Sequence, residues 1–339
     1  MEKGIKRNTF WKDKCVLITG ANGFLGSHLS MALIQLHARV VGIIKERSRG
    51  SYLDFVLKGI KRSRVRIIKS DIINLKAMLE IFRAYQPDIC LHVAAQPIVG
   101  IANKSPLGTF EANIKGTWNI LEAARICKTH AVVVASSDKA YGEHRRLPYK
   151  EDSALLALHP YDTSKACADV LTRCYAHTFG LPTAVTRCSN IYGPGDLNFS
   201  RIIPDTIRST ILNRDPVIRS DGTPVRDYVY VDDVVRGYLL LAKKLYEGKV
   251  RKGEAFNFGT QRPIRVLSLV NKILILIKKP HLKVRILSKK KIKGEIERQF
   301  LSIKKAKQEL NWKPQHSLEE GLRKTVAWYS SHPFYCKNF

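Results

Sequence analysis

The chain has 339 residues, 45% of them hydrophobic, which is enough to bury a substantial core and argues against intrinsic disorder. No stretch approaches the roughly 20 consecutive apolar residues that a membrane span needs, and the basic N-terminus lacks the apolar core of a signal peptide, so we expect a cytoplasmic protein without membrane contact. The formal net charge of +29 could attract nucleic acid, but the lysines and arginines are spread along the chain and accompany no nucleic-acid-binding motif, so such a partner is not expected.

Short apolar runs alternate with amphipathic stretches in the first half of the chain. The runs predict strands at residues 15–19, 39–44, 65–69, 89–93 and 131–135, and the stretches predict helices at 24–36, 75–85 and 108–127. This alternation is typical of βαβ units, and almost continuously apolar strands indicate a sheet covered on both faces. We therefore predict an α/β fold with a Rossmann-type, doubly wound parallel sheet.

The second half of the chain is less regular. It predicts helices at 161–179, 201–213, 232–245, 266–278 and 318–330, strands at 183–188 and 255–258, and a loop rich in Gly, Pro and Asn at 190–198. We expect a larger domain at residues 10–188, to which the chain returns at about 226–262. Residues 189–225 and 263–330 are expected to form a smaller C-terminal lobe.

A glycine-rich segment, GANGFLG at residues 20–26, separates the first predicted strand from the first predicted helix. Glycines allow a tight turn and a close approach of the backbone to a diphosphate at the helix N-terminus. The spacing GxxGxxG differs from the usual GxGxxG fingerprint, but its place at the start of a βαβ series predicts dinucleotide binding by the larger domain. The residues concerned are Gly20, Asn22, Gly23, Phe24, Leu25 and Gly26.

The end of the second predicted strand bears on the choice between NAD and NADP. An acid at this strand tip usually binds the ribose hydroxyls of adenosine, and the run GIIKER at residues 42–47 has none at the tip. Lys45 and Arg47 could accept a 2′-phosphate, or they could be ordinary surface charges. Both NAD and NADP therefore stay open.

Two groups of polar residues suggest catalysis. Ser137, Asp138 and Lys139 follow the fifth predicted strand, at the sheet edge where ligands bind in open α/β folds. Tyr161 and Lys165 are four residues apart and share one face of a predicted helix. A nearby ammonium lowers the pKa of a phenol from about 10 toward neutrality, which makes Tyr161 a plausible general base for a sugar hydroxyl. The alternative is an ordinary surface pair.

In combination, these motifs resemble the extended short-chain dehydrogenase/reductase family over almost the whole chain. Matching segments are TGANGFLG (19–26), SDI (70–72), HVAAQP (92–97), NIKGT (113–117), SSDKAYG (136–142), YDTSK (161–165), RCSNIYGPGD (187–196), RDYVYVDD (226–233) and FNFG (256–259). The chain is most similar to the nucleotide-sugar 4,6-dehydratases, and the segments FWKDK (10–14), AAQP (94–97) and SDK (137–139) resemble the CDP-glucose branch. RDYVYVDD and NIYGPGD resemble the dTDP-glucose and epimerase branches, so the nucleotide base of the substrate stays open.

The resemblance implies conversion of an NDP-hexose, CDP-glucose by preference, to its 4-keto-6-deoxy form with a tightly bound, regenerated NAD or NADP. The sugar is oxidised at C4, loses water across C5–C6 and receives the hydride at C6. Tyr161 would take the 4-hydroxyl proton, Lys165 would hold the cofactor ribose, and Ser137 would hydrogen-bond the oxygen. Asp138 would be the acid of the elimination, and Lys139 would be the base at C5 or would position the sugar.

The resemblance implies further contacts. Cofactor contacts would also come from Asp71, Ile72, Ala94, Ala95, Gln96 and Asn113, and substrate contacts from Gln96, Asn190, Arg226 and Arg298. The helices near 108–127 and 161–179 would form a homodimer. No metal site is expected, because the seven cysteines form no Cys-x-x-Cys pair.

Three alternatives stay open. The first is an NDP-sugar 4-epimerase, which has no need of Asp138. The second is a GDP-mannose or dTDP-glucose 4,6-dehydratase. The third, from a different class, is a non-catalytic NAD(P)-binding protein that uses its basic surface.

Overall fold

The computed structural model describes residues 9–46, 51–57, 64–288 and 296–337. The chain divides into two compact units, each assembled from separate segments. The first unit contains the chain up to Ser136, then His159–Thr186 and Tyr238–Ala255, and the second contains Ser137–Leu158, Arg187–Gly237 and the chain from Phe256 onward. Among the described residues, no helix combines the length and apolar character needed to cross a bilayer.

The first unit is built on a parallel, seven-stranded sheet, as predicted. The strand order is β11-β6-β5-β4-β1-β2-β3, so the chain starts in the interior of the sheet and works toward both edges. The strands are β1 (Cys15–Thr19), β2 (Arg39–Ile44), β3 (Val65–Lys69), β4 (Ile89–His92), β5 (Ala131–Ala135), β6 (Thr183–Cys188) and β11 (Glu254–Phe258). In the register, Thr19 at the end of β1 pairs with Ile43 on one side and His92 on the other.

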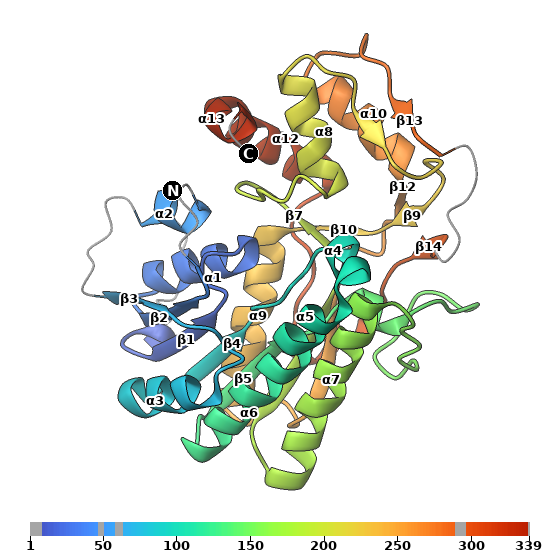
Figure 1. Ribbon diagram of the computed structural model, residues 1–339. Coiled ribbons are helices and arrows are strands. Elements are labelled where there is room, and N and C mark those ends of the chain that lie inside the picture. Colours follow the sequence, from blue (N-terminus) through green and yellow to red (C-terminus); the bar gives the residue numbers. More distant parts are fainter. Residues whose placement is uncertain (1–8, 47–50, 58–63, 289–295, 338–339) are drawn as a thin grey trace. The chain divides into compact units, whose positions relative to one another are not determined.

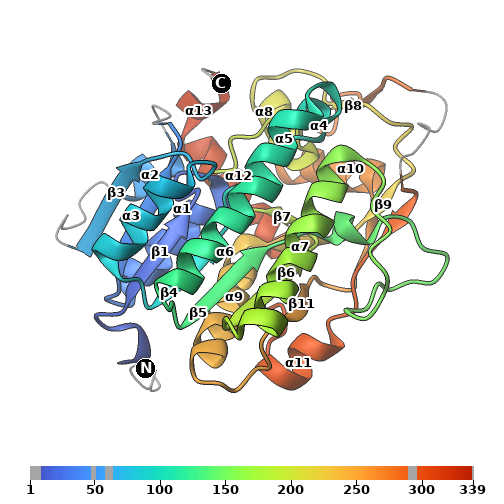
Figure 2. The ribbon, with the colours of Figure 1, turned by 60° about the horizontal axis from the view of Figure 1, so that its bottom comes forward.

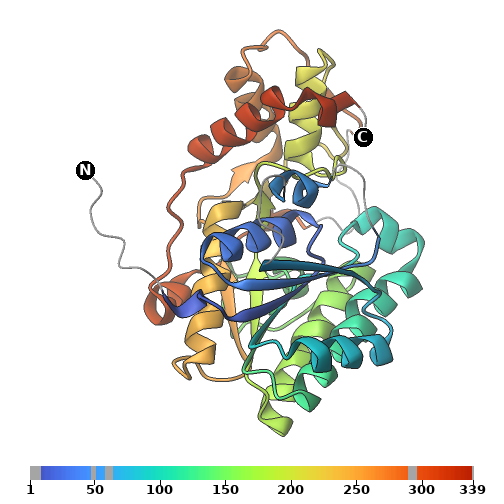
Figure 3. The same ribbon diagram turned by 90° about the vertical axis from the view of Figure 1, so that its left-hand side faces the viewer.

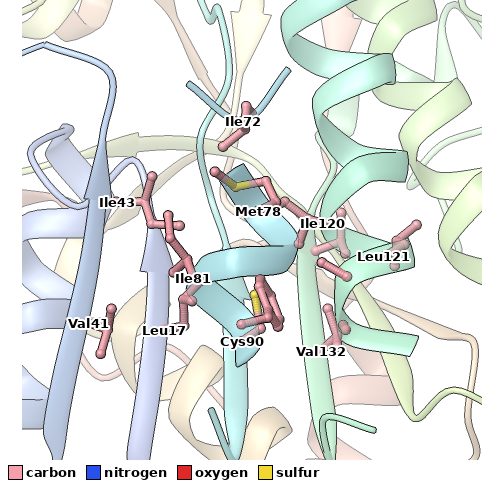
Figure 4. Close-up of a cluster of buried hydrophobic side chains, with 14 of the residues drawn as sticks. Leu17, Val41, Ile43, Ile72, Met78, Ile81, Cys90, Ile120, Leu121 and Val132 are labelled. Atoms are coloured by element: carbon pink, nitrogen blue, oxygen red, sulfur yellow. The ribbon is translucent and has the colours of Figure 1, made fainter. Parts of the chain in front are cut away.

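Helices cover both faces of this sheet. Helices α3 (Leu75–Tyr85), α6 (Gly116–Ile126) and α7 (Pro160–Phe179) pack beside one another on one face, and α1 (Phe24–Gln35) lies on the opposite face (Figures 2 and 3). Figure 4 shows the core under α3 and α6, where side chains of the sheet meet those of the two helices; the labelled members are Leu17, Val41, Ile43, Ile72, Met78, Ile81, Cys90, Ile120, Leu121 and Val132. The apolar runs and the amphipathic periodicity of the sequence together produce this packing.

The single helix predicted at residues 108–127 is wrong in one respect. The segment begins with α5 (Pro106–Phe110), passes through a π-helical turn, η3 (Glu111–Lys115), and continues as α6. A π turn inserts an extra residue and shifts the faces of the helix on either side of it, a device frequent at functional sites. Asn113 lies within this turn and is buried.

The second unit contains small sheets and helices (Figure 1). β7 (Asn190–Tyr192) pairs with β10 (Tyr228–Tyr230), β9 (Val225–Arg226) lies between β12 (Ile264–Arg265) and β14 (Arg298–Gln299), and β8 (Val217–Ile218) pairs with β13 (Arg285–Ile286). The helices are α8 (Ile202–Ile211), α10 (Val266–Leu276), α11 (Lys304–Leu310), α12 (Leu318–Ser331) and α13 (Pro333–Lys337). The loop predicted at 190–198 therefore begins with a short strand.

Other short elements were not predicted. These are η1 (Thr9–Trp11), α2 (Tyr52–Val56), α4 (Val99–Lys104) and the 3-10 helix η4 (Asp138–Tyr141). The remaining helix, α9 (Val231–Tyr246), matches the helix predicted at 232–245.

Residues 137–158 belong to the second unit, whereas the sequence-based boundaries placed them in the larger domain. The reason is backbone pairing. Tyr149 donates its N–H to Phe300 O at 3.0 Å, and its carbonyl accepts from Ser302 N at 2.8 Å. This pairing ties the segment to residues far along the chain, and no local sequence pattern reveals such a partner.

Candidate active site

The glycine-rich segment forms a tight turn between β1 and α1. Gly20 has a positive φ of 69°, and a Cβ there would lie 2.8 Å from the Cα of Ala94. A Cβ on Gly26 would lie 2.1 Å from the carbonyl oxygen of Gly20, so the turn has no room for a side chain at either position. Gly23 is the N-cap residue of α1 and has no side chain to cap it. A bare backbone at a helix N-terminus fits the diphosphate of a dinucleotide.

Polar contacts tie this turn to the neighbouring strand ends. Asn22 donates from Nδ2 to the carbonyl of Glu46 at 2.8 Å. Lys45 Nζ lies 3.0 Å from Asp71 Oδ2, and Asp71 Oδ1 accepts from Ile73 N at 3.2 Å. Lys45 is thus already paired with a carboxylate. Arg47, the other predicted cation, lies outside the described residues.

A buried hydrogen-bond chain leads from β1 to the π turn. Thr19 Oγ1 accepts from Ala94 N at 3.1 Å and lies 2.7 Å from His92 Nδ1. His92 Nε2 lies 3.1 Å from Thr117 Oγ1, which in turn donates to the carbonyl of Asn113 at 2.6 Å. Burial, with the positive charge of Lys165 as a second cause, lowers the pKa of His92 to about 3. The imidazole is therefore neutral, and it donates from Nε2 and accepts at Nδ1.

Asn113 continues this chain toward helix α7. Its Oδ1 accepts from Gln96 N at 2.7 Å, and its Nδ2 donates to Ser164 Oγ at 2.9 Å. Ser164 Oγ donates to the carbonyl of Tyr161 at 2.7 Å. Asn113 therefore joins the loop after β4, which carries Gln96, to the first turn of α7, which carries Tyr161.

The lysine of the YxxxK motif is anchored at the end of β5. Lys165 is 5% exposed, and its Nζ donates to the carbonyl of Ala135 at 2.8 Å. Ser136 Oγ donates to the carbonyl of Lys165 at 3.0 Å. Lys165 is thus held at the carboxyl end of β5, and Asn113 connects the first turn of α7, which carries Tyr161, to the loop after β4.

The second unit holds Ser137, Asp138 and Lys139 at η4. Ser137 caps this short helix by accepting from Lys139 N, and its hydroxyl donates to Asp138 Oδ1, both at 3.2 Å. Lys139 Nζ lies 3.4 Å from the same Oδ1. Asp138 is 2% exposed, and its Oδ2 has no hydrogen-bond partner within the described part of the chain. A buried carboxylate oxygen without a partner is costly, and a ligand hydroxyl there would relieve that cost.

The predicted substrate residues of the second unit lie on short strands beside η4. Asn190, on β7, accepts at Oδ1 from Lys139 Nζ at 3.5 Å. Arg226, on β9, donates to the carbonyls of Val225 and Glu297 at 3.0 and 3.3 Å. On the neighbouring strand β14, the exposed Arg298 places its guanidinium 5.4 Å from the ring centroid of Phe300. Both arginines lie on paired strands, Arg226 opposite Gln299 and Arg298 opposite Val225.

A buried polar cluster holds Tyr141, the last residue of η4. This cluster was not predicted from the sequence. Arg187 is 1% exposed and donates to Tyr141 Oη at 2.8 Å and to the carbonyl of Glu151 at 2.9 Å. Tyr141 donates in turn to Asn257 Oδ1 at 2.8 Å. Burial raises the pKa of Tyr141, so the hydroxyl stays protonated and structural. The signal was available, because Arg187, Tyr141 and Asn257 lie in three of the matching segments.

The chain is similar to several known proteins. The family model described as GDP-mannose 4,6 dehydratase matches residues 17–325. The chain is 31% identical to the probable dTDP-glucose 4,6-dehydratase of Sinorhizobium fredii, over 93% of this chain and 92% of that protein. It is 29% identical to the CDP-glucose 4,6-dehydratase of Salmonella typhimurium, over 95% of this chain and 92% of that protein.

Two solved structures show how widely the fold is shared. The dTDP-glucose 4,6-dehydratase DesIV of Streptomyces venezuelae, solved with NAD bound, superposes with a TM-score of 0.86 at 28% identity, over 95% of this chain and 98% of that one. The UDP-glucose 4-epimerase of Thermotoga maritima, solved with UDP-glucose, has a TM-score of 0.84 at 29% identity, over 94% of this chain and 99% of that one. Dehydratases and epimerases are therefore distinguished by side chains and not by fold.

Proposed function

Because the chain belongs to the GDP-mannose 4,6-dehydratase family of nucleotide-sugar enzymes, we propose that it converts an NDP-hexose to the NDP-4-keto-6-deoxyhexose. The observation that carries the proposal is Asp138, a buried carboxylate with one oxygen left without a partner in the described chain and Lys139 beside the other. Removal of the 6-hydroxyl requires an acid of this kind. A 4-epimerase has no use for it.

The glycine turn and its surroundings fit a nicotinamide dinucleotide. Gly20 to Gly26 would hold the diphosphate, Asp71 and Ile72 the adenosine end, and Lys165 the nicotinamide ribose. Ala94, Ala95, Gln96 and Asn113 would complete the site. A bound nicotinamide would supply the hydride acceptor for oxidation at C4 and the hydride donor for reduction at C6. NAD is favoured over NADP, since Asp71 already neutralises Lys45 at 3.0 Å.

Each proton movement of the reaction is assigned to one side chain. Tyr161 takes the proton of the 4-hydroxyl, and Lys165, on the same helix face, supplies a positive charge that favours the phenolate. Ser137 hydrogen-bonds the same sugar oxygen. In the elimination, Lys139 in its neutral amine form takes the C5 proton, the electron pair forms the C5–C6 double bond, and the 6-hydroxyl leaves as water with a proton from the carboxylic acid form of Asp138.

The substrate would be held by its diphosphate. Arg226 and Arg298 supply forked donors on adjacent strands, and Asn190 and Gln96 supply amides. CDP-glucose is our first candidate, because the Asp138–Lys139 pair resembles that branch. The dTDP-, UDP- and GDP-hexoses are the alternatives.

A homodimer would use the helical face of the first unit. The helical run from α5 to α6 lies beside α7 (Figure 2). Several large apolar side chains on these helices are 41–69% exposed: Leu107, Trp118, Ile126, Val170 and Phe179. Contiguous apolar exposure on paired helices fits a helix-bundle interface between two copies of the chain.

The test is turnover of purified protein with CDP-, dTDP-, UDP- and GDP-hexoses. The 4-keto-6-deoxy product develops an ultraviolet absorbance in base, and the C4 epimer does not. We expect that chromophore from one substrate, and its loss in Asp138→Asn. A C4 epimer formed without the chromophore would assign the chain to the epimerases instead.

A further inference from the structure

A second buried carboxylate, Asp227, joins three separate segments of the second unit. It is 0% exposed. Its Oδ2 accepts from Thr260 N at 2.8 Å, from the Ser189 hydroxyl at 3.1 Å and from Gln261 N at 3.3 Å, and its Oδ1 accepts from the Thr260 hydroxyl. The side chain of Asp227, in the link between β9 and β10, is therefore bonded both to the residue just before β7 and to the turn after β11.

The backbone of Asp227 fixes the orientation of Asn190. The carbonyl of Asp227 accepts from both the backbone N and the Nδ2 of Asn190, each at 3.1 Å. Because the NH2 end of the amide is held there, its Oδ1 must point the other way, toward Lys139 Nζ at 3.5 Å.

Lys139 is held by two oxygens at the long end of hydrogen-bond distance. They are Asn190 Oδ1 at 3.5 Å and Asp138 Oδ1 at 3.4 Å. Neither contact alone fixes an ammonium strongly. Moving Asn190 would therefore leave Lys139 to close on Asp138 or to turn outward.

The surroundings of Asp227 leave no room for rearrangement. A Cβ on Gly259 would lie 2.6 Å from Asp227 Oδ2 and 2.5 Å from Ser189 Oγ. Only glycine fits against this carboxylate, so its hydrogen-bond partners are held close together.

We propose that Asp227 is a positioning residue for the elimination step, which keeps Asn190 oriented so that Lys139 stays beside Asp138. The proposal rests on the dehydratase function above and extends it to a residue without direct contact with the reacting atoms. If Asp227 only stabilised the fold, its substitution would slow every step of the reaction to the same extent. A positioning role affects the C5–C6 chemistry in particular.

Asp233 is a matched control in the same RDYVYVDD segment. It is 1% exposed and accepts from Gln315 N at 2.8 Å, from His316 N at 3.0 Å and from Arg236 at 3.0 Å. These partners belong to α9 and to the segment before α12. Asp233→Asn should therefore destabilise the second unit to a similar degree without reaching Lys139.

The first measurement separates two steps within one turnover. Asp227→Asn and Asp233→Asn are mixed with CDP-glucose, or with whichever hexose the wild type converts, in deuterated water. Reduced-cofactor absorbance reports C4 oxidation, and deuterium at C5 of the product reports elimination. We expect Asp227→Asn to slow deuterium incorporation about tenfold more than oxidation, and Asp233→Asn to leave the ratio unchanged. Equal ratios in the two variants would overturn the proposal.

The second measurement needs no substrate. Lys139 is 26% exposed, so acetic anhydride reaches it, and mass spectrometry gives its acetylation rate as a function of pH. We expect that profile to change in Asp227→Asn and to stay unchanged in Asp233→Asn. An unchanged profile in Asp227→Asn contradicts the proposal, and this result does not depend on whether the protein is a dehydratase. Wild-type protein without turnover would reject the dehydratase function separately. If Asp227→Asn does not fold, Thr260→Val removes one hydroxyl donor and serves as the milder variant.

Discussion

Acidification should destabilise the first unit through one residue, His92. The side chain is 2% exposed, and both ring nitrogens are occupied by threonine hydroxyls, Thr19 at 2.7 Å and Thr117 at 3.1 Å. Burial, and to a smaller extent Lys165, lowers the pKa from 6.5 to about 3. The unfolded chain binds a proton here near pH 6.5, while the folded chain does not until about pH 3.

The direction and size of the effect follow from this difference. Above pH 6.5 both states are neutral at His92, so the residue adds no pH dependence. Below pH 6.5, each further pH unit lowers the free energy of unfolding by about 1.4 kcal/mol. The total loss is about 3 kcal/mol at pH 4. That loss is a large fraction of the free energy of unfolding of a typical domain, which is roughly 5–15 kcal/mol.

The assay is urea unfolding at pH 7, 6, 5 and 4 for wild type, His92→Gln and His130→Gln. His92→Gln should be less stable than wild type at pH 7, because its hydrogen bonds are disrupted, but it should lose about 3 kcal/mol less on acidification to pH 4. His130 is exposed, so its variant should follow the wild type. Parallel pH profiles for wild type and His92→Gln would refute the reasoning.

Four other predictions concern separate parts of the molecule. Gly26→Ala should weaken NADH binding about tenfold or more in a fluorescence titration, because its Cβ would lie 2.1 Å from a backbone carbonyl, whereas Gly100→Ala, with nothing within 4 Å, should not. Asp138→Asn should lower product formation about 100-fold or more, while cofactor reduction in a single turnover persists. Loss of both product formation and cofactor reduction would contradict the role of Asp138 as the acid of the elimination. Arg187→Met should cost about 2–3 kcal/mol in urea unfolding, since Tyr141 and a carbonyl lose a charged donor, and an unchanged midpoint would contradict the role given to the cluster. Val170→Glu should convert a dimer to a monomer in sedimentation, and a monomeric wild type would reject that interface.

The large sheet could be predicted because its strands carry their own signal. The predicted bounds of β1, β2, β3 and β5 match the structure. β1, β2 and β5 are short, mostly apolar runs that are buried, whereas β3 is a partly exposed strand at the sheet edge. The π turn at Asn113 had no such signal, because the apolar pattern continues through it. The two-residue strands of the second unit were missed for another reason. Val217 pairs with Arg285, and a partner so distant in sequence leaves no local pattern.

The site shows the same division between local and long-range information. The glycine turn and the Tyr161–Lys165 pair are set by fixed spacings within one turn or one helix, so the sequence alone predicts them. The hydrogen bonds of His92 span 25 and 73 residues, and those of the Asp227 side chain span 33 to 38 residues. Single-sequence patterns do not contain that information.

The interleaving of the two units has a consequence for biosynthesis. The first unit receives its last segment at Tyr238–Ala255, so about three quarters of the 339 residues must leave the ribosome before it is complete. Strand β11, at the sheet edge next to β6, arrives in that late segment. Until then the outer edge of β6 is unpaired, although its other edge can pair with β5, and we expect this intermediate to be the species that depends most on chaperones.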